Sequence, residues 1–255
     1  MNEIKRDTLL ALLSVGKRPD NRGMNDYRKM TLQSEVSQNA EGSALATIGK
    51  SQVMAGIKFD VATPFPDRPS EGVLSTSADL LPLASHLFET GPPSEDAIEL
   101  ARVVDRGLRS AEIIDLESFF LEEGKVLALY VDIFVLDHDG NLFDASTLAA
   151  MAALRCTRMP KIENGKIIRG EYAGKLPLKG DVVSCTFGKL GDRIFLDPSL
   201  DEEKGMDARL TLATTEEHVC AGQKGGWGSF SEKDLTAMSE ISFQKGNELR
   251  ALLRE

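Results

Sequence analysis

The sequence has few of the residues that mark secreted or metal-binding proteins. It contains three cysteines and three histidines among 255 residues. Cys156, Cys185 and Cys220 are odd in number and widely spaced, which argues against a disulfide framework and favours a reducing compartment. The histidines are too far apart to suggest a local metal site. We therefore expect no disulfide bond, no metal and no other cofactor.

Long hydrophobic runs are also missing. The longest apolar stretch, Val126 to Leu136, is interrupted by Asp132. It is far shorter than the roughly 20 residues that a membrane helix needs. Glu3, Lys5 and Asp7 precede any accumulation of apolar residues, unlike the start of a secretory signal. The sequence thus predicts a soluble cytoplasmic protein that does not associate with membranes.

Positive charge is in deficit, because 30 basic residues stand against 40 acidic ones and give a net charge of −10. Taken alone, this balance argues against a nucleic-acid partner, since binding to phosphates depends on lysine and arginine. A binding site is local, however, so the distribution of the positive charges matters more than their sum. The hydrophobic content of 42% and charged content of 27% are ordinary for a globular protein.

The first half of the chain alternates between helical and strand patterns. Residues 2–15 predict an amphipathic helix that ends at Gly16. Its apolar face consists of Ile4, Leu9, Leu10 and Leu13. Four further elements follow from hydrophobic periodicity, namely strands at 43–48, 52–61 and 125–136 and a helix at 96–116. A helix rich in small residues is expected at 145–157, before Pro160.

The second half repeats this order with more strands. Short strands separated by glycine and aspartate turns are expected at 181–189, 193–196, 208–213 and 218–221. A final helix follows, with Ser231 as its candidate N-cap. Each half therefore has strands followed by a helix, which predicts an α+β protein with two pseudo-similar βαβ-type lobes. We divide it into an N-terminal helix and basic arm (1–30), a first lobe (31–165) and a second lobe (175–255), with the boundary between Lys161 and Lys179.

Two glycine-containing segments could bind phosphate. Gly49-Lys50-Ser51 resembles the end of a P-loop, but Ala44 stands where that motif needs a glycine, and the segment joins two strands. A hairpin turn explains it better. The glycine-rich run from Gly222 to Gly228 could cradle a phosphate before the last helix, since helix N-termini bind anions. It lacks the ordered spacing of a dinucleotide fingerprint, so a flexible loop is the alternative.

Charged residues gather in three places. The first is an acidic cluster of Asp197, Asp201, Glu202, Glu203 and Asp207. Its carboxylates could hold Mg²⁺ or act as general acid and base, or they could simply be solvated. The turn-rich stretch from Lys17 to Arg28 is basic, and a solvated linker is its plain interpretation.

Arg102, Arg106 and Arg109 form the third group. Their spacings of four and three place them on one helix face, about 5–6 Å apart. An anion-binding stripe and salt bridges to Asp105, Glu99 or Glu112 remain alternatives.

In this order, the motifs resemble the RNase PH family of phosphorolytic ribonucleases. The resemblance begins with Arg18-Pro19-Asp20-Asn21-Arg22 and Arg28, and continues in Gly42-Ser43-Ala44 and the hairpin through Gly49. It includes the long strand that ends at Asp139-Gly140, the small-residue helix, and the segment from Asp201 to Asp207. It covers essentially the whole chain. It implies an RNase PH-like α+β fold with mixed sheets and packed helices, of the ribosomal protein S5 domain 2-like type.

The family reaction is the attack of inorganic phosphate on the 3′-terminal phosphodiester of RNA, for which arginine is well suited as a bidentate phosphate ligand. By resemblance, active members place one arginine just before the helix that begins near Asp96 and another in the turn after the long strand. This sequence has Asp96 and Phe143 at those places. The sequence most resembles the non-catalytic RNase PH-type ring subunit of the archaeal exosome. The points of likeness are Asp26-Tyr27-Arg28, the segment from Met206 to Leu210, the pair Gly225-Gly226 and the arginine-rich helix from Arg102 to Arg109.

Such a subunit alternates with a catalytic paralogue in a hexameric ring, a trimer of heterodimers, that admits single-stranded RNA and carries RNA-binding cap proteins. The resemblance implies that this chain shapes the partner's active site and binds RNA through Arg102 and Arg106, with Arg109 behind them. The alternative is an active phosphate-dependent 3′–5′ exoribonuclease that uses Asp201 and Asp207, whose six-residue separation matches the family's catalytic aspartates. A nucleotide-binding enzyme that uses the run from Gly222 to Gly228 is a third hypothesis.

Overall fold

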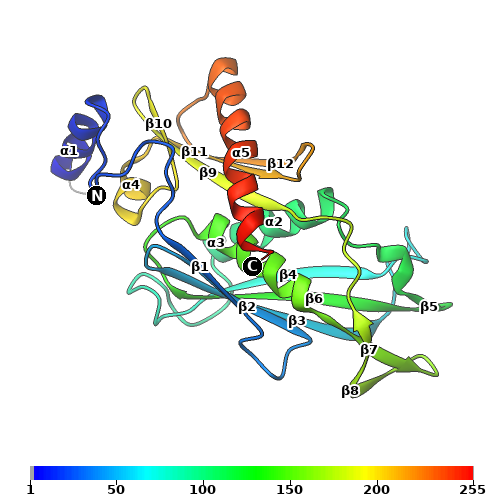
Figure 1. The fold of residues 1–255 in the computed structure, drawn as a ribbon. Coiled ribbons are helices and arrows are strands. Elements are labelled where there is room, and N and C mark those ends of the chain that lie inside the picture. The colour runs from blue at the N-terminus through cyan, green and yellow to red at the C-terminus, as the bar shows by residue number, and fades with distance from the viewer. Residues whose placement is uncertain (1–2, 255) are drawn as a thin grey trace.

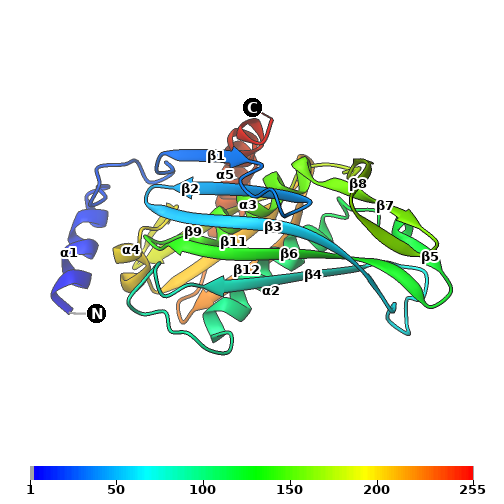
Figure 2. The ribbon, with the colours of Figure 1, turned by 90° about the horizontal axis from the view of Figure 1, so that it is seen from below.

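The computed structural model describes residues 3–254 and the side chains of residues 6–254. Two β-sheets are stacked with two helices, α2 (Glu95–Ser110) and α3 (Leu142–Cys156), between them, and a third helix, α5 (Glu232–Leu252), covers the outer face of the second sheet (Figures 1 and 2). The expected α+β architecture with mixed sheets and packed helices is confirmed.

The first sheet is mixed and belongs to the first half of the chain. Its strands, in spatial order, are β1 (Met30–Ser34), β2 (Gly42–Ile48), β3 (Ser51–Ala62), β6 (Lys125–Asp137) and β4 (Val73–Leu80), with the short β5 (Phe120–Glu122) also paired to β6. Strand β4 runs parallel to β6, and the other pairs are antiparallel. The predicted turn at Gly49 is confirmed as the tight connection from β2 to β3, where φ is 63°.

Strand β6 is an interior strand of this sheet, between β3 and β4. Its residues Val131, Ile133 and Val135 are fully buried, whereas Tyr130 on the opposite face is 36% exposed. Its near-continuous apolar sequence indicates a strand covered on both faces, but this second face is only partly covered. The neighbouring β4 was not predicted, because its sequence contains three consecutive hydroxyl residues and an aspartate. Only Leu74 and Ala78 of β4 are buried in the core.

Helix α3 is sandwiched between the sheets, and every residue from Leu142 to Leu154 is buried. Its alanines allow both sheets to approach closely. The helix begins three residues earlier than predicted, because Asn141 reverses the chain with a φ of 54°. Helix α2 ends at Ser110 and not at Leu116, since Glu112 adopts a φ of 49° that no α-helix accommodates. A short 3₁₀ helix, η1 (Leu116–Phe119), follows.

The second sheet is antiparallel, with the strands β10 (Arg193–Leu196), β9 (Val183–Leu190), β11 (Ala208–Thr214) and β12 (Val219–Gly226) in spatial order. The short helix α4 (Leu200–Gly205) follows β10. Ser231 caps α5 as predicted, because its hydroxyl accepts the N–H of Asp234.

The prediction of a glycine-rich loop from Gly222 onward is wrong. Residues 222–226 belong to β12 and pair with β11, with Gly226 opposite Ala208. A side chain at Gly225 would lie 3.0 Å from the guanidinium of Arg209, and one at Gly226 only 2.6 Å from the carbonyl of Asp207. The glycines therefore permit close packing of a strand rather than binding of a phosphate at a helix N-terminus.

A β-hairpin occupies the region predicted as the boundary between the lobes. It consists of β7 (Arg158–Glu163) and β8 (Lys166–Lys175). Asn164 and Gly165 form its turn, with φ values of 51° and 68°. An Asn-Gly pair between two runs of strand-forming residues is a strong hairpin signal that the sequence analysis missed.

The N-terminal helix α1 (Glu3–Ser14) packs on the second half of the chain. Its Leu9 and Leu13 form a small separate core with Leu190 and Phe195, and Gly16, with a φ of 72°, ends the helical segment as expected. The Ile4 side chain, also predicted for this face, lies outside the described residues. Within residues 3–254, no helix combines the length and apolarity that crossing a membrane requires.

Candidate functional site

The basic arm after α1 follows the surface, but two of its arginines, Arg18 and Arg28, are buried. A solvated linker is therefore the wrong interpretation for these two charges. Arg18 donates to both carboxylate oxygens of Glu202 at 2.8 and 2.6 Å. It also donates to the carbonyls of Leu196 and Asp197 at 2.7 and 2.8 Å. The side chains of both Arg18 and Glu202 are almost completely excluded from solvent. The arm thus ties the start of the chain to the second sheet.

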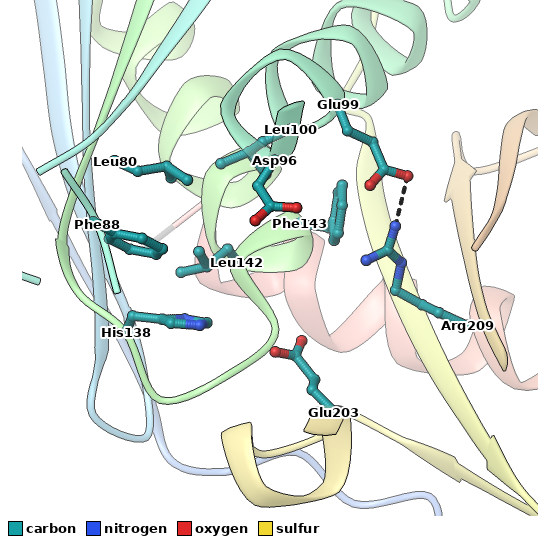
Figure 3. A pocket seen from close by; sticks show the side chains of 10 residues that line it. All are labelled: Leu80, Phe88, Asp96, Glu99, Leu100, His138, Leu142, Phe143, Glu203 and Arg209. Atoms are coloured by element: carbon teal, nitrogen blue, oxygen red, sulfur yellow. Dashed lines mark hydrogen bonds and ion pairs between the residues drawn. The ribbon is translucent and has the colours of Figure 1, made fainter. Parts of the chain in front are cut away.

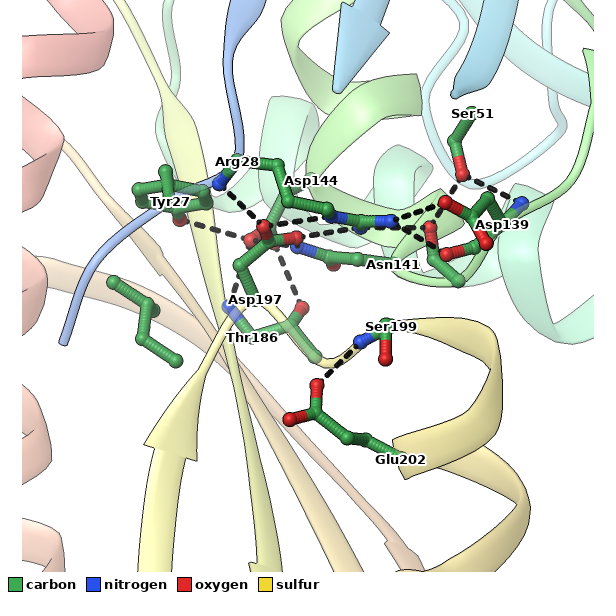
Figure 4. A network of polar contacts seen from close by, with 12 residues as sticks. Tyr27, Arg28, Ser51, Asp139, Asn141, Asp144, Thr186, Asp197, Ser199 and Glu202 are labelled. Atoms are coloured by element: carbon green, nitrogen blue, oxygen red, sulfur yellow. Dashed lines mark hydrogen bonds and ion pairs between the residues drawn. The ribbon is translucent and has the colours of Figure 1, made fainter. Parts of the chain in front are cut away.

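Asp197 is the hub of a second set of contacts (Figure 4). Its fully buried carboxylate accepts hydrogen bonds from Arg28 at 2.7 and 2.9 Å, from Arg22 at 2.7 Å and from Asn141 Nδ2 at 2.7 Å. Burial alone would raise the pKa of Asp197, but the hydrogen bonds and charge of Arg28 outweigh it and lower the pKa. Asp197 is therefore a structural anion.

This network fixes the turn that follows β6. Arg28 donates to the carbonyls of Asp139 and Gly140. The Ser51 hydroxyl donates to the Gly140 carbonyl at 2.6 Å and accepts the Asp139 N–H at 2.9 Å. The backbone N–H of Asn141, the residue after Gly140, donates to Glu203 Oε1 at 2.8 Å. The first residues of α3, including Phe143, are placed by these contacts.

Asp144 lies on the other side of Asn141 and accepts four hydrogen bonds. The donors are the Tyr27 hydroxyl at 2.9 Å, Asn141 Nδ2 at 2.8 Å, and the N–H and hydroxyl of Thr186 at 3.0 and 2.7 Å. Burial raises the pKa of Asp144 to about 7 despite these donors. The cluster joins the basic arm, α3 and β9 in one buried polar centre.

A pocket of about 150 Å³ opens beside this turn, between the starts of α2 and α3. Its lining residues are Leu80, Phe88, Asp96, Glu99, Leu100, His138, Leu142, Phe143, Glu203 and Arg209 (Figure 3). Asp96 and Phe143, which stand where the resemblance implies arginines, thus face the same space. Phe143 occupies the first turn of α3 and not the preceding turn of the chain.

The pocket is unfavourable for a phosphate. Asp96, Glu99 and Glu203 contribute carboxyl groups, and burial raises the pKa of Glu203 to about 7. The guanidinium of Arg209 is already committed, since it binds Glu99 at 2.7 Å and lies 4.0 Å from the centre of the Phe143 ring. Burial also lowers the pKa of His138, which keeps that ring neutral near pH 7.

The arginine stripe lies on the exposed face of α2, outside the pocket. Arg109 forms a salt bridge of 3.0 Å with Asp105 and donates to the Leu74 carbonyl at 2.9 Å, so one of the expected salt bridges forms. Arg106 donates to Gln223 at 3.1 Å. Arg102 and Arg106 line two adjoining surface depressions of about 310 and 410 Å³.

Comparison with known proteins decides the family. Models of two domains of the 3′ exoribonuclease family, RNase PH domain 1 and domain 2, match residues 26–160 and 181–245. The chain belongs to the RNase PH family. It is 46% identical to "Exosome complex component Rrp42" of Thermococcus gammatolerans, over all of this chain and 96% of that protein.

Solved structures agree with this membership. The RNase PH chain described here is similar to a chain of the Archaeoglobus fulgidus exosome with RNA bound to the active site, with a TM-score of 0.89 and 41% identity over 98% of this chain and 97% of the other. It is also similar to a chain of an archaeal exosome core, with a TM-score of 0.88 and 40% identity over 99% and 97% of the two chains.

The acidic pair, Asp201 and Asp207, does not meet at the pocket of this RNase PH member. Asp207 accepts Arg6 at 2.6 Å and the N–H of Gly191 at 2.9 Å, and Asp201 lies on the exposed side of α4. Among residues 3–254, no three carboxylate, histidine or cysteine side chains converge closely enough to hold a metal ion. Three members of the predicted acidic cluster, Asp197, Glu202 and Asp207, instead form salt bridges with different arginines.

Sequence reasoning missed Glu203 and Arg209 as pocket residues. Glu203 was one of five acidic residues in a row of turns, with nothing to distinguish it. Arg209 carried a better signal, because it is the charged residue of strand β11, whose other residues are all uncharged. The glycine opposite it, Gly225, leaves the room that its guanidinium needs.

Proposed function

We propose that this chain is a non-catalytic structural subunit of an archaeal-type exosome ring, which degrades RNA from 3′ to 5′ by phosphorolysis. Full-length similarity to relatives named as an exosome component supports the assignment to that complex. The single observation that carries the non-catalytic role is the pocket, where Asp96 and Phe143 stand in place of the two expected phosphate ligands.

Electrostatics explains why these replacements matter. Loss of one preorganised donor typically costs about 10²–10³ in rate. Here two donors are absent from the expected positions, and Asp96 adds a charge of the same sign as phosphate. Arg209 cannot compensate without leaving Glu99 and the Phe143 ring. Phosphate binding should therefore be abolished.

The proposed partners are a catalytic RNase PH-type paralogue in a hexameric ring, a trimer of heterodimers, together with RNA-binding cap proteins, all in the cytoplasm. Arg102 and Arg106 are the proposed RNA contacts of this subunit. Both are exposed on α2, and a positive groove that follows the backbone is the usual device for binding single strands without regard to sequence. Arg109 contributes less, because Asp105 already neutralises it.

One assay separates this proposal from the alternative of an active exoribonuclease using Asp201 and Asp207. The purified chain is incubated with single-stranded RNA, phosphate and Mg²⁺, alone and together with the catalytic paralogue. Nucleoside diphosphate release is expected only when the paralogue is present. Release by the chain alone would refute the proposal. The mass of the mixed particle tests the ring stoichiometry.

A further inference from the structure

The pocket that contains Asp96 and Phe143 is hostile to phosphate, yet it is open and lined by both rings and carboxylates. We propose that it binds the base of one cytosine, recognised through its amino group. The source of the base, RNA entering the ring, rests on the proposed function. The recognition itself rests on the volume, walls and polar groups of the pocket.

The volume selects a single ring. The pocket measures about 150 Å³, roughly half the ~300 Å³ at which sites for drug-sized ligands begin. An apolar cavity of about 150 Å³ accommodates a benzene-sized ring. A pyrimidine therefore fits better than a purine, and the sugar and phosphate of a nucleotide would remain outside.

The walls suit a flat ring. Phe88 and His138 are stacked on one side of the pocket, with ring centres 5.3 Å apart and an angle of 24° between the planes. Phe143, covered by Arg209, forms the opposite side (Figure 3). Proteins that bind unpaired bases commonly stack them on such aromatic and guanidinium surfaces.

The polar groups distinguish cytosine from uracil. The carboxyl groups of Asp96 and Glu203 point toward the middle of the pocket from opposite sides (Figure 3). The N–H of Asn141 holds Glu203 through Oε1 at 2.8 Å, which orients that side chain. Burial raises the pKa of Glu203 to about 7, so this carboxyl is ionised above that pH and the titration is run at about pH 8. Ionised carboxyl groups accept hydrogen bonds from the N4 amino group of cytosine. Uracil presents a carbonyl oxygen at that position, which a carboxylate repels.

A small cation is the main competing ligand. The carboxyl groups are spread around the pocket and do not converge as metal ligands do, within the part of the chain that the structure describes. Much of the remaining lining is apolar, including Leu80, Leu100 and Leu142. This lining gives a planar base a large contact surface and offers little to a compact, strongly hydrated ammonium ion.

The test uses free nucleosides, which carry no phosphate. The full chain, without its paralogue, is titrated with cytidine and with uridine, and binding is followed by NMR shifts of residues in the pocket. Saturable cytidine binding at least about tenfold tighter than uridine binding is expected. Equal affinities, or no saturable cytidine binding, would overturn the proposal. So would displacement of cytidine by butylammonium at a lower concentration than cytidine itself requires.

Variants locate the site. Glu203→Gln and Leu100→Phe are expected to weaken cytidine binding about tenfold or more. In the first, the amide oxygen keeps the contact with the Asn141 N–H, and an NH₂ donor replaces the carboxylate oxygen that would accept from cytosine. The second fills the space. Glu240→Gln, at an exposed position of α5 that does not line the pocket, is the matched control and should leave cytidine binding unchanged. Circular dichroism confirms the fold of each variant. The wild-type comparison of cytidine with uridine decides the question even if a variant is unfolded.

The nucleoside titration and the degradation assay test the two proposals separately, so either proposal can be refuted without the other. Loss of cytidine selectivity leaves the scaffold role intact, because that role is measured by diphosphate release with and without the paralogue. Diphosphate release by the chain alone refutes the scaffold role and leaves the nucleoside result readable.

Discussion

The guanidinium of Arg209 lies 4.0 Å from the centre of the Phe143 ring. A cation would normally be available to an anion entering the pocket, but here it is held between an aromatic face and the carboxylate of Glu99. Phe143 therefore has two effects on phosphate binding. It replaces an arginine that would bind phosphate, and its ring holds the guanidinium of Arg209, the arginine that lines the pocket.

Replacing Phe143 with alanine should destabilise the protein and release Arg209. The ring is 6% exposed, so its removal is expected to lower the free energy of unfolding by about 3 kcal/mol. Phe143→Leu is the matched control. It keeps most of the buried volume and should cost about 1 kcal/mol, part of it from the lost cation–π contact. Urea denaturation measures both losses, and a loss in Phe143→Leu as large as that in Phe143→Ala would contradict the expectation that buried volume makes up most of the contribution of Phe143.

Reversing Arg102 and Arg106 to glutamate should weaken RNA binding by the assembled ring, most strongly at low salt. Contacts to phosphate release counterions, so the salt dependence of the affinity should also become shallower. Fluorescence anisotropy with single-stranded RNA at several salt concentrations measures this. Arg68→Glu, on the exposed loop between β3 and β4, is the control for net charge. Undiminished low-salt binding in an intact ring would refute the assignment.

Substituting Arg28 by alanine should destabilise the fold strongly, because it leaves the fully buried carboxylate of Asp197 with fewer partners. Removal of one partner of a buried ion pair typically costs about 3–5 kcal/mol. Arg169→Ala, an exposed arginine on β8, should cost less than about 1 kcal/mol. Thermal unfolding of the two variants tests the contrast, and similar melting temperatures would contradict it.

Asp144 makes stability depend on pH. Its pKa is raised to about 7 in the folded protein, whereas an unfolded aspartate titrates near pH 3.9. The folded state therefore holds a proton that the unfolded state has lost, and stability falls as pH rises from about 4 to about 7. Glu203, with a pKa of about 7, acts in the same direction.

Because of Asp144, the free energy of unfolding should fall by on the order of 2 kcal/mol between pH 5 and pH 8. Asp144→Asn is expected to flatten this part of the stability curve, because its amide oxygen can accept from Tyr27 and Asn141 while its NH₂ faces the Thr186 hydroxyl. Denaturation measured at pH 5 and pH 8 checks the effect. An unchanged pH dependence in the variant would show that Asp144 is ionised throughout.

The parts of the fold that were predictable are those with strong local patterns. Helix α3 is buried on all sides, so its apolar sequence identifies it. Strand β6 has one fully buried face and a second, partly exposed face that is nevertheless apolar at Tyr130 and Phe134, so its long apolar run also identifies it. Strand β4 is half polar, and its pairing with β6 depends on residues about 55 positions away. The glycine-rich sequence of β12 is typical of a loop. The structure explains these glycines, because side chains at Gly225 and Gly226 would collide with Arg209 and Asp207 of the neighbouring segment.

The site was predictable only in part. Asp96 and Phe143 were identified through the family resemblance, and the structure brings them into one pocket. The partners of the basic arm could not be foreseen, because Arg18 and Glu202 are separated by 184 positions. Charge patterning along the chain describes near neighbours, and it therefore favoured a solvated linker for an arm whose Arg18 and Arg28 are buried.

The salt bridges between the basic arm and the segment after β10 also affect the order in which the chain folds. Arg18, Arg22 and Arg28 emerge early in synthesis, but their partners Asp197 and Glu202 emerge far later. Contacts of such high sequence separation are slow to form. Until residues 197–202 have been made, Arg18 and Arg28, which are buried in the folded protein, remain in water. The N-terminal arm is therefore among the last parts of the molecule to reach its final place.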